Sequence, residues 1–169
     1  MTAVGQVKHA VAAAIKAAGC AAIESYSEEQ LKRYATAVAA VGTKETVIEE
    51  SGAIEYLGEK VDEATQETVS VYGRKMLLTL LIEVYVPRTV GAAGCEEAAE
   101  TITQAMMTAL PEGLKLGSLQ WGKTGWDKTT GMFRLDASAK YAAYFVAEAA
   151  EDETVFTDFV LKGTVKERE

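Results

Sequence analysis

The sequence predicts an α+β domain, a mostly antiparallel sheet with two helices packed on one face. Three observations carry this prediction. Residues 74–86 alternate strictly between apolar and mixed positions and stop at Pro87, which is typical of a strand. Apolar residues recur at helical spacing near the N-terminus and again after a glycine-rich turn at 88–95. The last third alternates between strand patterns and turn residues.

The strand predicted over residues 74–86 is the core strand of the domain. Its buried row contains Met76, Leu78, Leu80, Ile82, Val84 and Val86. The opposite row is mixed, and it includes Leu77, Leu81 and Tyr85. In a free one-sided sheet these three side chains would face water, so we expect the second face to be covered partly by the chain or by another subunit. Leu77, Leu81 and Tyr85 are therefore candidate interface residues.

Three elements precede the core strand. Apolar spacing from Val4 to Ala18, followed by Gly19, predicts an amphipathic helix of about four turns. The segment 27–33 begins with an N-cap serine, Ser27, but is long enough for only one or two helical turns. Residues 36–50 favour a strand that is broken or bulged near Gly42.

A long acidic connection is predicted at about residues 45–72, before the core strand. Residues 45–67 contain eight acids and one base, Lys60, which gives a local net charge of −7. Either this span is a solvated, mobile connection, or it forms a functional acidic surface. If the second holds, the candidate residues are Glu55, Glu59, Asp62 and Glu63.

The second half predicts a helix followed by three strands. Glu96, Glu97 and Glu100 favour the start of a helix through its dipole, and a Leu-Pro-Glu-Gly segment at 110–113 ends it. Strands are then predicted at 114–121, 132–146 and 154–165, with a hairpin connection at 126–131 and a second turn at 147–153.

Length and composition fit one ordered domain over residues 1–169. The net charge of −8 argues against a general nucleic-acid binder, which needs clustered Lys and Arg. Cys20 and Cys95 lie far apart in a chain without a recognisable secretory leader, so we expect two reduced thiols. No run approaches the roughly 20 apolar residues of a membrane span, and we expect a soluble protein without a membrane partner.

One nucleotide-binding motif matches by letter. Residues 117–124, GSLQWGKT, fit the phosphate-cradling pattern G-x-x-x-x-G-K-[ST]. That loop requires a helix to begin at its Lys-Thr pair, so that backbone N–H groups converge on the phosphates. Here Gly125 and Gly131 bracket poor helix formers and a strand follows. We interpret Lys123 and Thr124 as exposed residues at a hairpin tip.

Other catalytic groups are sparse. His9 is the only histidine, so a catalytic triad or a multi-histidine metal site would depend on that residue alone. There is no nucleophile elbow, no C-x-x-C and no calcium-loop spacing. The sequence therefore predicts no catalytic, cofactor-binding or metal site, and no enzyme.

With its elements in this order, the chain resembles the tail-terminator family of phages and of related contractile particles of Gram-positive bacteria. The resemblance covers most of the chain. It depends on the order of the elements and on the kinds of residue within them rather than on a catalytic signature. The segments that carry it are the opening helix, Leu31–Tyr34, Gly73–Pro87, Gly94–Glu97, Leu114–Leu119, Trp126–Arg134 and Phe156–Gly163.

The resemblance implies a small α+β domain, six copies of which form a ring that caps the tail tube and joins it to the head or collar. The implied partners are the chain itself and tail-tube, sheath or collar proteins, with DNA only passing through. The implied location is the bacterial cytoplasm during assembly and then a virion or a headless bacteriocin-like particle. A tail-tube or tail-completion protein is the nearer alternative, and a P-loop nucleotide hydrolase is the distant one.

Overall fold

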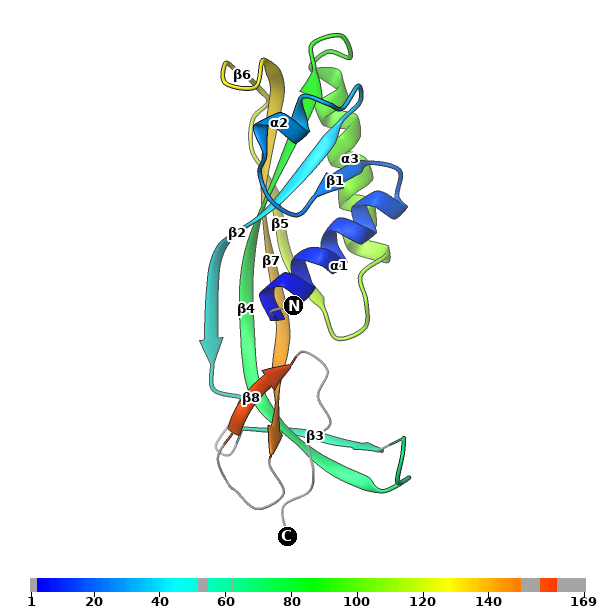
Figure 1. Cartoon of the computed structure of the whole chain (residues 1–169), viewed down its shortest axis with the longest axis vertical. Helices are drawn as coiled ribbons and strands as arrows, with labels where there is room; N and C mark the ends of the chain where they lie inside the picture. Colours follow the sequence, from blue (N-terminus) through cyan, green and yellow to red (C-terminus); the bar gives the residue numbers. More distant parts are fainter. Residues whose placement is uncertain (1–2, 52–54, 62, 150–155, 161–169) are drawn as a thin grey trace.

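The fold is a single twisted sheet of eight strands with its two long helices on one face, in a computed structural model that describes residues 3–51, 55–61, 63–149 and 156–160 (Figure 1). The α+β class predicted from the sequence is confirmed. The helices are α1 (Ala3–Ala17), α2 (Glu28–Leu31) and α3 (Ala93–Thr108). The strands are β1 (Ala21–Ile23), β2 (Val38–Glu49), β3 (Tyr56–Val61), β4 (Thr68–Pro87), β5 (Lys115–Trp121), β6 (Gly125–Asp127), β7 (Met132–Ala149) and β8 (Phe156–Val160).

Strand β4 lies at the centre of the sheet, as the alternation predicted. It pairs antiparallel with β2 on one side and with β7 on the other, and the sheet order is β1-β2-β4-β7-β5. Strands β6 and β8 pair with the two ends of β7, and β3 pairs with the start of β4. Because β4 begins at Thr68, it is longer than the predicted strand.

Both long helices cover the same face of the sheet. The predicted buried row of β4, from Met76 to Val86, packs in one core cluster with apolar residues of α1 and α3. Val11 and Ile15 of α1 and Ile102 of α3 are fully buried there. Burying a side chain of this size contributes roughly 1.5–3 kcal/mol, so this layer is the main source of stability.

The N-terminal elements follow the sequence with small differences. Ser27 caps α2 by accepting a hydrogen bond from the backbone N–H of Gln30. The predicted irregularity in β2 is a register shift between Thr43 and Glu45, close to Gly42. Strand β1, which pairs parallel with β2, was not predicted because three residues give too short a pattern to recognise.

The predicted acidic connection at 45–72 contains regular structure instead. Residues 45–49 belong to β2, and β3 pairs with residues 68–72 of β4 as a hairpin that projects from the lower end of the sheet (Figure 1). We call β3 and residues 63–72 the hairpin arm. Acidic residues interrupt the apolar alternation here, so the sequence pattern did not predict this hairpin. Pairing between the two strands stabilises it.

Gly73 marks the point where the hairpin arm leaves the main sheet. Its N–H donates to the carbonyl oxygen of Glu55 at 2.8 Å, and it is the first β4 residue paired with β7, opposite Val146. A Cβ atom at this position would lie 1.9 Å from the carbonyl oxygen of Phe145. Only glycine therefore allows the two backbones to approach this closely.

The C-terminal part is a set of strands around β7. The predicted hairpin connection is a turn between β6 and β7, in which Gly131 has a φ of 68° and donates from its N–H to the Asp127 carbonyl oxygen at 2.9 Å. The second predicted turn is only partly described, since β7 extends to Ala149 and residues 150–155 lie outside the described part.

Candidate subunit interface

The outer face is defined here as the sheet face opposite α1 and α3. Alternation along β4 places Leu77, Leu81 and Tyr85 on it, as predicted. Directly paired residues of neighbouring strands share a face, so the sheet register extends this surface to β2, β7 and β5. The three candidate residues nevertheless have two different environments.

Tyr85, in the upper half of the outer face, is buried by the chain itself. It is only 1% exposed and packs in a second, smaller core cluster that includes Leu31 of α2 and Met132 of β7. The ring of Tyr26 lies 6.0 Å away, centroid to centroid. Tyr85 is therefore not available to a second subunit, because the segment around α2 already covers it.

An ionic cluster surrounds Tyr85. Arg134 binds Asp136 with two hydrogen bonds, at 2.7 and 2.8 Å, contacts Glu83 at 2.7 Å and lies over the Tyr85 ring. The Tyr85 hydroxyl donates to Glu83 at 3.2 Å. Burial and the nearby Glu83 carboxylate raise the pKa of Tyr85, and the hydrogen bonds that Arg134 donates to Asp136 raise the pKa of Arg134. Each charge has a partner, so the cluster stabilises the fold.

In the lower half of the outer face, the described residues form no such cluster. Leu77 and Leu81 are half-buried, and neither belongs to the core cluster with α1 and α3 or to the smaller cluster that includes Leu31 of α2. Val47, paired with Leu77, is 39% exposed, and Tyr144, paired with Lys75, is 47% exposed. Sequence reasoning did not place Val47 and Tyr144 on this surface, because only the pairing register brings them beside Leu77. We call Val47, Leu77, Leu81 and Tyr144 the apolar strip, although Lys75 and Thr79 alternate with its members along β4.

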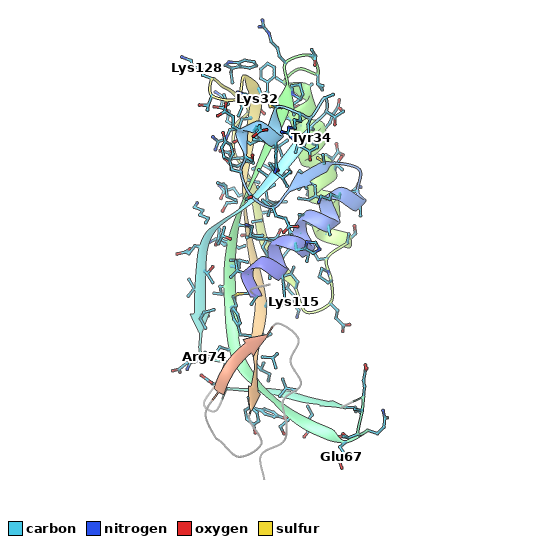
Figure 2. The ribbon with its side chains drawn as sticks, in the orientation of Figure 1. Lys32, Tyr34, Glu67, Arg74, Lys115 and Lys128 are labelled. Atoms are coloured by element: carbon cyan, nitrogen blue, oxygen red, sulfur yellow. The ribbon has the colours of Figure 1, made fainter. Side chains whose placement is uncertain are left out.

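The predicted acidic residues do not form one cluster. Glu55 is half-buried and forms an ion pair with Arg74 at 2.6 Å, beside the base of the hairpin arm. Glu59 lies on β3 and Glu63 in the turn that follows, and both are exposed. Asp62 lies outside the described residues. Figure 2 shows Arg74 near the base of the arm and Glu67 near its tip, so the acidic side chains lie along a projection.

The nucleotide-binding motif does not have the geometry that a phosphate loop needs. Strand β5 ends at Trp121, β6 begins at Gly125, and no helix starts at Lys123. Lys123 and Thr124 line an open hollow together with Glu96, whose carboxylate would repel a phosphate. The indole N–H of Trp121 donates to the Thr103 hydroxyl at 3.0 Å, which ties β5 to α3.

The remaining candidate groups have structural surroundings. His9 forms a 2.7 Å contact with the carboxylate of Glu24 on the surface. Cys20 and Cys95 are buried free thiols, and burial raises the pKa of both. Within the described ranges, no group of three or more His, Cys, Asp and Glu side chains could hold a metal ion. None of the helices in the described part has the length and apolar character needed to cross a membrane.

Comparisons with known proteins find similarity among solved structures. No protein-family model matches the chain, and no curated protein matches it. Among solved structures, a chain described as "Virion of native gene transfer agent (GTA) particle" is similar, with a TM-score of 0.41 and 15% identity. The match covers 84% of this chain and 95% of that chain. At this score, the similarity does not by itself indicate a function.

Proposed function

We propose that the chain is a non-enzymatic structural protein of a phage-type tail, a tail terminator that acts as a homo-hexameric ring. The ring caps the tail tube and joins it to the head or collar. The observation that carries the proposal is the apolar strip on the lower outer face, at Leu77, Leu81, Val47 and Tyr144. An apolar surface of this kind on a sheet marks a contact with another protein. The sequence resemblance described above supplies the type of particle.

The decisive experiment compares two neighbouring residues of β4 that point to opposite faces. Replacing Leu81 by Glu should block ring formation and leave the monomer folded, because an interface core rejects an unpaired charge. Replacing Leu80, which is fully buried, by Asp should unfold the monomer. Light scattering after size-exclusion chromatography, run as a concentration series, measures assembly, and circular dichroism measures folding. Leu81→Glu unfolding the chain as severely as Leu80→Asp would contradict the interface.

A tail-tube or tail-completion protein of the same particle is the nearer alternative. The same apolar strip would then contact a different neighbour. The two roles differ in the number of copies per particle, since a terminator forms one ring and a tube protein forms many. Counting copies per purified particle separates them.

A P-loop hydrolase is the distant alternative, and nucleotide binding tests it. A ligand at 100 times its Kd stabilises a fold by about 2.7 kcal/mol, which raises the melting temperature measurably. Because Glu96 lines the hollow and no helix begins at Lys123, we expect no shift with millimolar ATP and magnesium. A rise that disappears in Lys123→Ala would favour the hydrolase.

A further inference from the structure

The sheet has two free edges at the same height. On one side, β1 pairs only with residues 38–40 of β2, so residues 42–49 have no further partner among the described strands. On the other side, β7 is the only described strand that pairs with β5. Cross-strand pairing joins Val47, Leu77, Ala142 and Lys115 in one row, which shows that the two edges lie level with each other. Figure 2 shows Lys115 at the lower end of β5.

Strand direction suits pairing between these two edges. Strand β4 is antiparallel to β2, β7 to β4, and β5 to β7, so β5 runs antiparallel to β2. If a second copy is placed beside the first in the same orientation, its β2 meets β5 of its neighbour as an antiparallel pair. The helices of both copies then remain on the same side of the sheet. Addition of a strand to an exposed edge is a common mode of protein association.

The charges on the two edges are opposite. Residues 43–50 are all exposed and contain Glu45, Glu49, Glu50 and Lys44, for a net charge of −2. Strand β5 and the two residues after it, 115–123, contain Lys115 and Lys123 and no acid, for a net charge of +2. No ion pair within the described part of the chain involves any of these residues. A contact between two β2 edges would therefore be repulsive, whereas β2 against β5 is attractive.

We propose that neighbouring copies join head to tail through these edges, β2 of one copy against β5 of the next, so that the sheet continues around the ring. This inference rests on the proposed ring and assigns its contact. A head-to-tail contact is heterologous, and it closes into a ring when the rotation between copies allows it. Leu77 and Leu81 lie on the strand next to β2, so the seam passes beside the apolar strip.

A register shift occurs on each edge, between Thr43 and Glu45 on β2 and between Leu116 and Ser118 on β5. Bulges and charges on an edge strand also protect monomers from unwanted pairing. If the bulges and charges only protected the monomer, two charge-reversed variants would not restore assembly when they are mixed. The experiment therefore uses complementation between two charge-reversed variants.

The β2 variant carries Glu45→Lys and Glu49→Lys, and the β5 variant carries Lys115→Glu and Lys123→Glu. Each variant has two edges of the same sign, so each should remain monomeric at concentrations where the natural chain forms rings. Mixed in equal amounts, they should assemble, because the edges alternate in sign around the ring. Control variants with the same change in charge, Glu97→Lys with Glu100→Lys and Lys16→Glu with Lys128→Glu, place it away from the edges and should assemble normally. Light scattering gives the mass in each case.

Each outcome has one meaning. Two monomeric variants that assemble only when mixed support the edge contact. If either variant assembles alone as well as the natural chain does, or if the mixture stays monomeric, the edge contact is wrong and the ring itself stands. If the natural chain is monomeric at every concentration, the ring proposal fails, and the edge contact fails with it.

Discussion

At the scale of single residues, Tyr85 shows what alternation can and cannot predict. The period of two correctly placed Tyr85 on the same face as Leu77 and Leu81. It could not predict that residues around α2, more than 50 positions earlier in the chain, fold over the upper half of that face. For the same reason, alternation over residues 132–146 places Arg134 and Asp136 on one face of a strand but does not predict the ionic cluster that they form beside Tyr85.

Asp127 is the residue for which the structure gives a pH-dependent prediction. Its carboxylate accepts from the Thr130 hydroxyl at 2.6 Å and from the N–H groups of Thr130 and Thr129 at 3.1 and 3.3 Å. The hydrogen bond from the Thr130 hydroxyl is the main cause that lowers the pKa of Asp127, and the N–H groups of Thr130 and Thr129 lower it further. Replacing Asp127 by Asn should destabilise the fold by about 1–2 kcal/mol at pH 7, because bonds to a charged acceptor are lost.

The pH dependence of that difference follows from the direction of the shift. Since folding lowers the pKa of Asp127, the carboxylate stabilises the fold above the unfolded value of about 3.9. The contribution disappears as pH falls through the lower, folded-state value. Urea denaturation of both chains between pH 7 and pH 3 measures it. A difference in unfolding free energy that stays constant over this range would contradict the assignment.

At the scale of elements, long periodic segments were predictable and short or charged ones were not. The alternation of residues 74–86 and 132–146 gave β4 and β7, and helical spacing gave α1 and α3. Helix α3 begins at Ala93, before the acidic residues that were expected to open it. Strand β3 was missed, since its residues 56–61 include Gly58, Glu59 and Lys60, and only pairing with β4 makes them a strand.

Gly73 gives a prediction for the joint between the sheet and the hairpin arm. Replacing it by Ala should destabilise the fold by about 3 kcal/mol, because the added Cβ would lie 1.9 Å from the backbone carbonyl oxygen of Phe145. Neither backbone can move away without breaking the pairing of β4 with β7. Thermal and urea denaturation measure the loss. Gly42→Ala, where the nearest atom is 3.8 Å from the added Cβ, is the matched control and should be nearly neutral.

At the scale of the whole molecule, the faces of the sheet differ in how far other elements cover them. Among the described residues, α1 and α3 cover one face and the segment around α2 covers the upper outer face, whereas Val47 and Tyr144 are exposed on the lower outer face. The hairpin arm extends from the lower end of the sheet and contains Glu59, Glu63 and Glu67. A ring built from such subunits would present six copies of the arm, so the arm's orientation decides which surface of the ring is acidic.

We predict that part of the acidic span faces the central channel of the ring. A channel through which DNA passes benefits from repelling phosphate, because attraction summed over six copies would hold the duplex. Of the four candidates, Glu59 and Glu63 are exposed on the arm, whereas Glu55 is held by Arg74 at the base of the arm. Replacing Glu59, Asp62 and Glu63 by lysine should change the stability of the monomer by no more than about 1 kcal/mol, since exposed charges contribute little.

The assembled lysine-substituted ring should instead retain duplex DNA at low salt and release it as salt rises, because phosphate binding by lysines is strongly salt-dependent. Gel-shift assays with the natural ring and with the Glu97→Lys, Glu100→Lys ring, which carries added positive charge on α3, measure the difference. If both substituted rings retain DNA, any added positive charge is sufficient for retention, and the result does not support a channel position for the arm. A ring structure with Glu59 and Glu63 on the outer rim would exclude the channel position, since the arm would then point away from the DNA.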